Sequence, residues 1–163
     1  MARDAAVVHS PAYHCDIGVH VFPMEKFERL RHRLVTEGHV ADAAILDPAP
    51  APREDLARVH GAEYLDDLEA LRWTRRTKSS ELPLTAEIVL AFRLAAGGST
   101  LAAREALTRG FGVNLGGGFH HAHADHHGHR LGTHAVANHY RQRDAEYQTK
   151  NHKNTPDTHT TDS

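Results

Sequence analysis

The stretch FGVNLGGGFHH, residues 111–121, is the part of the chain on which the fold prediction depends. A short β-type run at 111–115 follows a long helical pattern and leads into three glycines and two adjacent histidines. Glycines let the backbone turn sharply and approach a ligand closely, because no Cβ is in the way. Such a turn would place His120 and His121 at the carboxyl edge of a parallel sheet, where α/β enzymes carry their chemistry. Two neighbouring imidazoles can act as general base and general acid near neutral pH.

The residues before this turn alternate between apolar runs and helical periodicities. Further strands are expected at 5–9 and 43–46, and helices at 23–38, 53–60, 62–73 and 85–108. Thr85 can cap the last helix, and Gly97-Gly98 inside it suggests close packing against another backbone. The polar segment 74–81 is expected to be an exposed loop. This alternation predicts an α/β fold with a parallel sheet. Three strands are few for such a sheet, so the architecture is expected to be incomplete.

The composition narrows the class of protein. The chain has 163 residues, 40% hydrophobic and 25% charged, with a net charge of −2 when histidine is neutral. We therefore expect one domain and no nucleic-acid or membrane partner. We expect no segment to span a bilayer, because no run approaches the apolar length needed, and the N-terminus lacks a secretory pattern. The single cysteine, Cys15, permits no internal disulfide and predicts a cytoplasmic location. The sequence does not determine the oligomeric state.

The C-terminal part has a different composition. Residues 126–163 contain no Phe, Ile, Met, Trp or Cys, and ten of the 16 histidines lie at or after His120. A segment with so little to bury cannot recover its ordering entropy by packing. The sequence therefore predicts a domain portion at 1–125 and a disordered, histidine-rich polar tail at 126–163.

Four motifs together resemble the N-terminal part of the zinc-dependent histone deacetylase family. They are Tyr13-His-Cys-Asp-Ile-Gly18 with His20-Val-Phe-Pro-Met24, Val59-His60 with Glu63-Tyr64-Leu65, Gly97-Gly-Ser-Thr100, and Asn114-Leu-Gly-Gly-Gly-Phe-His-His-Ala122 with Asp125. The likeness is greatest to the small class IV type, and it extends to acetoin-utilisation and acetylpolyamine deacetylase relatives. It covers roughly residues 5 to 125.

The resemblance implies a three-layer, arginase-like α/β fold and hydrolysis of acetyl-lysine or a related acylated amine by a zinc-bound water. By matching position, His120 and His121 would be the tandem catalytic histidines. Phe119 and Gly118 would contact the substrate near the floor of the acyl pocket, and His20 would lie near its mouth. By a looser correspondence, Lys26 would line an internal channel for acetate.

The chain departs from the family pattern after Asp125. The family continues with a Gly-Phe-Cys-type segment, a strand with Asp-x-Asp-x-His and a later metal-binding Asp, and none of these occurs here. The zinc ligands and the carboxylates that orient the two histidines are therefore missing from this sequence, and no metal site and no zinc-dependent turnover are expected. A shifted reading frame or a truncated gene is the hypothesis for the abrupt change.

Other interpretations of these residues stay open. The histidine pair could belong to an ordinary polar loop. A non-enzymatic metal binder is the alternative function, since imidazole suits Zn, Ni or Cu and six histidines cluster in this part of the chain; they are His120, His121, His123, His126, His127 and His129. A product with no function is the third. Cys15 is interpreted as an unreactive thiol, and the basic group from Arg72 to Lys78 as a solvated helix end.

Overall fold

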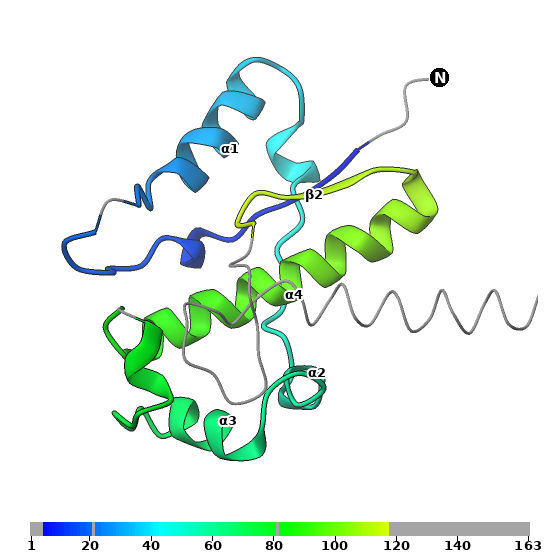
Figure 1. The fold of residues 1–163 in the computed structure, drawn as a ribbon. Helices are drawn as coiled ribbons and strands as arrows, with labels where there is room; N and C mark the ends of the chain where they lie inside the picture. Colours follow the sequence, from blue (N-terminus) through cyan, green and yellow to red (C-terminus); the bar gives the residue numbers. More distant parts are fainter. Residues whose placement is uncertain (1–4, 21, 81, 118–163) are drawn as a thin grey trace, which may run out of the picture.

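The computed structural model describes residues 5–20, 22–80 and 82–117 (Figure 1). Two strands, four α-helices and three 3₁₀ helices follow one another in this part of the chain. In order they are β1 (Ala6–Val8), η1 (Pro11–Tyr13), α1 (Lys26–Thr36), η2 (Asp42–Ala44), α2 (Arg53–Leu56), α3 (Ala62–Glu69), η3 (Thr77–Ser80), α4 (Ala86–Arg109) and β2 (Gly112–Asn114).

The sheet is small and parallel, as the sequence predicted. β1 pairs with β2, with Ala6 opposite Gly112 and Val8 opposite Asn114. On its other side, Val8 forms a parallel bridge with Leu46. Because all three segments run the same way, their carboxyl ends meet at one edge.

The predicted strand at 43–46 is wrong except at Leu46. Asp42–Ala44 forms the 3₁₀ helix η2, and only Leu46 joins the sheet. Two alanines and an aspartate have little β propensity, and Pro48 ends any extension of the pairing. Asp42 also forms an ion pair with Arg31, which connects η2 to helix α1.

The long helix α4 is the central element of the described residues. It contacts β1, β2 and η1, and Figure 1 shows it running along the full width of the ribbon. The hydroxyl oxygen of Thr85 accepts a hydrogen bond from the Ile88 amide at 3.2 Å, and Gly110 ends the helix with φ of 90°. The predicted helix, its cap and its end are confirmed. Contrary to the expectation from the sequence, α4 is long and apolar enough to cross a membrane by length and composition. Of the apolar window in α4, 44% is buried against other described residues.

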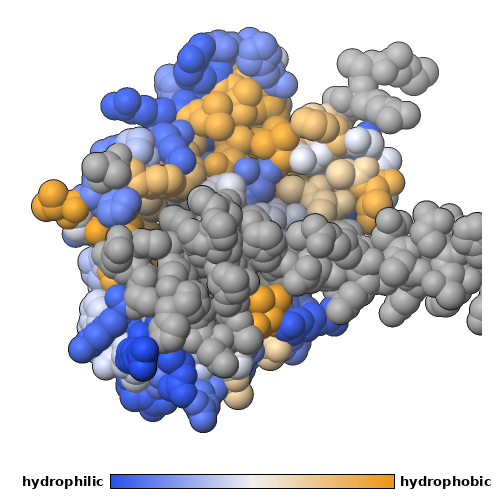
Figure 2. Space-filling model, in the orientation of Figure 1, coloured by the Kyte–Doolittle hydropathy of each residue, from blue (hydrophilic) through white to orange (hydrophobic). Residues whose placement is uncertain are grey.

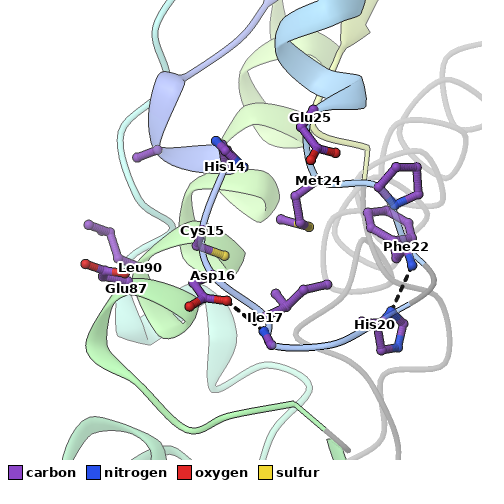
Figure 3. A pocket seen from close by; sticks show the side chains of 13 residues that line it. His14, Cys15, Asp16, Ile17, His20, Phe22, Met24, Glu25, Glu87 and Leu90 are labelled. Carbon is purple, nitrogen blue, oxygen red and sulfur yellow. Dashed lines mark hydrogen bonds between the residues drawn. The ribbon is translucent and has the colours of Figure 1, made fainter.

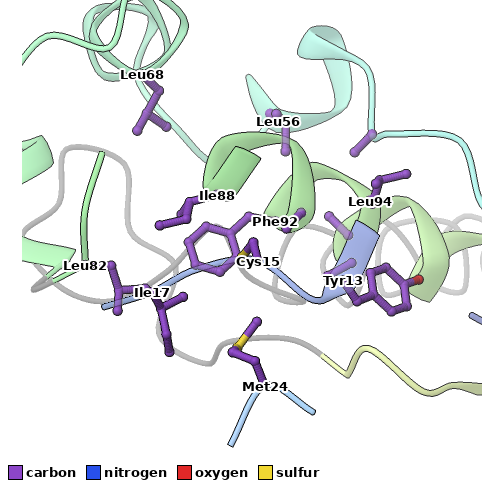
Figure 4. Packing of buried hydrophobic residues seen from close by; sticks show 14 of the residues in the cluster. Tyr13, Cys15, Ile17, Met24, Leu56, Leu68, Leu82, Ile88, Phe92 and Leu94 are labelled. Atoms are coloured by element: carbon purple, nitrogen blue, oxygen red, sulfur yellow. The ribbon is translucent and has the colours of Figure 1, made fainter. Parts of the chain in front are cut away.

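The hydrophobic core fills the space between α4 and the segments packed on it (Figure 4). Its members come from the segment 13–27, from α2, α3 and α4, and from Ala51 and Leu82 in the connecting segments. The largest are Tyr13, Ile17, Met24, Phe27, Leu56, Tyr64, Leu65, Leu68, Leu82, Ile88, Phe92 and Leu94. His60 and Tyr64 belong to the packing, with ring centroids 5.3 Å apart.

The tandem glycines of α4 mark two close contacts, of which the one at Gly97 is with another backbone, as expected, and the one at Gly98 is with side chains. A Cβ on Gly97 would overlap the carbonyl oxygen of Ala49, and one on Gly98 would overlap the Tyr13 hydroxyl. Two hydrogen bonds hold the first contact: the Ala51 amide donates to the Arg93 carbonyl at 2.8 Å, and Arg93 Nε donates to the Ala51 carbonyl at 3.0 Å.

Helix α1 begins and packs differently from the prediction. It starts at Lys26 rather than Pro23, because Pro23 lies in a turn closed by the Lys26 amide at 3.1 Å. Phe27 is buried, but Leu30 is 45% exposed. Figure 2 shows apolar surface over α1 on the face in view. The period that predicts a helix therefore does not tell which of its apolar residues are covered.

The segment after α3 was also predicted wrongly. Helix α3 ends at Glu69, where Trp73 had been expected, and Thr77 in the supposed exposed loop is 2% exposed. The buried Asp67 carboxylate explains this, since a buried charge needs partners. It accepts hydrogen bonds from Arg72 Nε at 3.0 Å and from the Thr74 hydroxyl at 2.9 Å.

Two cations of the basic group beyond α3 are thus part of the fold. Besides Arg72, Arg76 lies 3.3 Å from Asp67 and also pairs with Glu63.

Helix α2 is shorter than predicted as well, ending at Leu56 where His60 had been expected.

Candidate functional site

The carboxyl end of β2 carries a polar side chain that connects three parts of the fold. Asn114 Nδ2 donates to the Ala95 carbonyl at 2.9 Å and to the Ser99 hydroxyl at 3.1 Å, both on α4. Its Oδ1 accepts from the Tyr13 hydroxyl at 2.9 Å. Asn114 therefore fixes the end of the strand against both α4 and η1.

The same asparagine holds the glycine turn that follows. Its Oδ1 accepts from the Gly116 amide at 3.1 Å, and its Nδ2 donates to the Gly117 carbonyl at 3.2 Å. Gly117 has φ of 59°, and a Cβ on Gly116 would come 2.5 Å from the Tyr13 ring. The predicted sharp turn is confirmed at Gly116 and Gly117, where the backbone lies close to the Tyr13 ring, and the approach to a ligand stays a prediction.

The predicted catalytic histidines come directly after this turn in the sequence. Gly118, Phe119, His120 and His121, like Asp125 and the histidine-rich segment, lie outside the described residues. Their assignments as catalytic and substrate-binding residues stay predictions. The structure describes β2 and the first two glycines of the turn, which precede them in the sequence.

Tyr13 and Asn114 each begin one of the family motifs, but the sequence assigned neither of them a role in the site. Tyr13 is buried, and burial together with the charge of Asp47 raises the pKa of its phenol well above the usual range. It is therefore a neutral, fixed donor to Asn114 at neutral pH. One signal could have identified the pair: an asparagine in an apolar strand needs hydrogen-bond partners, because buried polar groups are almost always satisfied.

His9 lies at the same edge, just after β1. It is 4% exposed, its Nε2 is 3.5 Å from the Glu28 carboxylate, and its ring meets the Tyr13 ring edge-on at 5.7 Å. Burial lowers the pKa of the His9 imidazole, although Glu28 acts in the opposite direction. The folded protein thus favours neutral His9.

This lowered pKa makes stability depend on pH. The unfolded chain binds a proton at His9 more readily than the folded chain does. The free energy of unfolding is therefore unaffected by His9 above about pH 6.5 and falls as the pH drops below that value. Urea unfolding at pH 7.5 and 5.5 should show a smaller loss on acidification for His9→Gln than for the wild type. The exposed His39→Gln is the control. An equal loss in His9→Gln and wild type would contradict the expectation.

A cavity of about 720 Å³ opens beside η1, between the segment 12–25 and the start of α4 (Figure 3). His20 lines it, and His20 Nδ1 accepts a hydrogen bond from the Phe22 amide at 3.0 Å. Its place near the mouth of the active site and its contact with substrate stay predictions. Lys26 is not among the lining residues; its ammonium lies 3.7 Å from the Phe22 ring centroid, a cation–π contact.

The residues needed to hold a zinc ion are not found in the described part of the chain. Within residues 5–20, 22–80 and 82–117, no three His, Cys, Asp or Glu side chains come together in a way that could hold a metal ion. A protein zinc site takes three or four such ligands. The described residues therefore do not fit the metal that the resemblance implies.

Comparison with known proteins settles the family. The family model described as the histone deacetylase domain matches residues 20–132 of the chain. The chain belongs to the histone deacetylase domain family. This family member is 32% identical over 131 residues to histone deacetylase 2 of Arabidopsis thaliana, which covers 74% of the chain. It is also 32% identical over 118 residues to an uncharacterized protein of Picosynechococcus sp..

The fold of this deacetylase-family chain matches that of a solved relative. The crystal structure of the HDA15 HD domain superposes with a TM-score of 0.60, covering 86% of the chain at 20% identity. The arginase/deacetylase-type α/β fold expected from the sequence is thus confirmed. The deacetylase-family chain spans 34% and 39% of the two sequence relatives and 43% of the solved chain.

Proposed function

We propose that this chain supplies the histidine-bearing part of a deacetylase-type hydrolase that acts on acetyl-lysine or a related acylated amine. The observation that carries the proposal is the glycine turn at the carboxyl end of β2, fixed by Asn114 and seated against Tyr13. Sites of α/β enzymes lie at this edge of a parallel sheet. The family match extends over the turn and the two histidines that follow it.

In this proposal Tyr13 and Asn114 have positioning roles. Tyr13, kept neutral, donates to Asn114, and Asn114 holds the two glycines. His120 and His121 follow that turn in the sequence, and they would act as general base and general acid. Zinc, which the family generally uses, supplies an activated water in such chemistry. Because its ligands are not present among the described residues, no step is assigned to it.

The 163-residue chain is expected to show no deacetylase turnover. The family's Asp-x-Asp-x-His segment does not occur in the sequence, so the histidines have neither a metal-activated water nor a carboxylate that sets their tautomer. The assay uses a fluorogenic acetyl-lysine peptide with added zinc, and the expected rate is the rate without protein.

The opposite result has a clear signature. A rate that a hydroxamate chelator abolishes, and that His120→Ala also abolishes, would overturn the expected inactivity. His39→Ala is the matched control, because His39 is exposed and far from the turn in sequence. The described residues offer no observation in favour of the histidine-rich metal binder, which stays a prediction from the sequence.

A further inference from the structure

The strand β2 lies at one end of the described sheet. β1 is flanked on both sides, by β2 and by Leu46, whereas β2 has β1 as its one neighbour in the described part of the chain. An edge strand presents backbone amides and carbonyls to which another strand can bind. The outer edge of β2 is therefore a candidate surface for strand pairing.

The register shows which backbone groups lie on this outer edge. Toward β1, the Phe111 carbonyl accepts from the Ala6 amide at 3.1 Å, and the Leu115 amide donates to the Val8 carbonyl at 2.9 Å. Successive residues of a parallel strand direct their backbone groups to alternate sides. The amide and carbonyl of Gly112 thus point away from β1, and no described residue forms a hydrogen bond with either of them.

An apolar face adjoins this edge on the side of the sheet opposite α4. Gly112 faces α4, because a Cβ there would lie 2.1 Å from the Ala102 carbonyl oxygen. Neighbouring residues of a strand point to opposite faces, so Phe111 and Val113 point away from α4. Phe111 is 57% exposed, and Val113 is partly exposed. Since a parallel sheet normally has both faces covered, this apolar face indicates a further layer.

The fold match indicates what would occupy the edge and the face. The HDA15 HD domain fits 86% of this chain with a TM-score of 0.60, but the chain covers only 43% of that structure. The larger part of the solved chain therefore has no counterpart here. A second copy of this chain would bring the same edge and the same short sheet, and would not supply that part.

We propose that the outer edge of β2 pairs with a strand of a second polypeptide, one that carries the part of a histone deacetylase domain that this chain does not cover. The new strand bonds to the amide and carbonyl of Gly112, and an apolar layer of the same partner covers Phe111. Main-chain hydrogen bonds add a strand to an exposed sheet edge in this way. That the completed domain hydrolyses an acylated amine rests on the proposed function, whereas the association needs no turnover.

Co-expression tests the association. The tagged 163-residue chain is produced together with the part of Arabidopsis thaliana histone deacetylase 2 that follows the aligned segment, or with the corresponding part of the Picosynechococcus relative. A one-to-one complex is expected to survive affinity purification and size exclusion, with its mass measured by light scattering. Failure to form a complex with either partner would overturn the proposal.

A pair of exposed aromatic residues locates the contact. Phe111→Glu should weaken the complex about tenfold or more, because it removes the exposed ring and places a charge in an apolar contact. Trp73→Glu is the matched control, since Trp73 is 54% exposed in the segment after α3, and it should leave the dissociation constant unchanged. Dilution of the labelled complex measures the dissociation constant, and circular dichroism checks that both variants are folded. An unchanged dissociation constant in Phe111→Glu would contradict the assigned surface.

Hydrogen exchange at the edge is the second test. In the chain alone, the Gly112 amide should exchange faster than the Leu115 amide, which is bonded to Val8, and the complex should slow exchange at Gly112 about tenfold or more. Slow exchange at Gly112 in the chain alone would overturn the proposal, because residues 118–163 or a second copy would then already occupy the edge. A complex that forms but hydrolyses no acetyl-lysine peptide with zinc would contradict the proposed function and leave this association standing.

Discussion

Gly97→Val is expected to lower the free energy of unfolding by about 3 kcal/mol or more. The side chain of valine at this position would overlap the Ala49 carbonyl oxygen, which belongs to the backbone and cannot rotate away. The 49–51 segment would have to move off α4, breaking the Ala51–Arg93 hydrogen bonds at 2.8 and 3.0 Å. Urea unfolding followed by circular dichroism measures the change.

Leu107→Val is the matched control, because it places the same β-branched side chain in the same helix where residue 107 is 78% exposed. That variant should lose only a few tenths of a kcal/mol, the cost of β-branching in a helix. If Gly97→Val were as stable as Leu107→Val, the close contact between α4 and residues 49–51 would be wrong.

Asn114→Leu is expected to cost about 2–3 kcal/mol, because it removes every side-chain hydrogen bond at the end of β2 and leaves the buried Tyr13 hydroxyl without its partner. The glycine turn should become more mobile in the same variant. Hydrogen exchange of the Gly116 and Gly117 amides, read by nuclear magnetic resonance alongside urea unfolding, measures both effects.

A double-mutant cycle with Tyr13→Phe separates the contributions. Tyr13→Phe removes only the hydroxyl, so its cost should largely vanish in the Asn114→Leu background. Asn114→Asp keeps an acceptor for Tyr13 but sets a carboxylate oxygen beside the Ala95 and Gly117 carbonyl oxygens, and should cost at least as much as Asn114→Leu. Additive costs for Tyr13→Phe and Asn114→Leu would contradict the assigned hydrogen bond.

Local signals in the sequence predicted much of the fold. The cap at Thr85, the glycine at 110 and the apolar period between them define α4, and each acts within a few residues. The parallel sense of β1 and β2 was also predictable, since a long helical crossover separates them in the chain. The family resemblance, carried by spaced motifs, agrees with the histone deacetylase domain match.

Features that depend on distant partners were missed. The extended residue at Leu46 exists because β1 lies beside it, whereas the residues before it follow their own local preference. Thr77 is buried because Asp67 organises the chain after α3. At the candidate site, the glycine turn was predicted from its composition, but the Tyr13–Asn114 bond joins residues 101 positions apart and leaves no local pattern.

The tandem glycines of α4 also bear on how the chain folds as it is made. Synthesis proceeds from the N-terminus, so η1 and the 48–52 segment leave the ribosome well before residues 97 and 98. Both segments dock on those glycines, one on each. The first fifty residues therefore cannot pack against the glycines of α4 until that helix has been synthesised. Translational pausing or chaperone binding in this interval should affect the yield of folded protein more than events after residue 110.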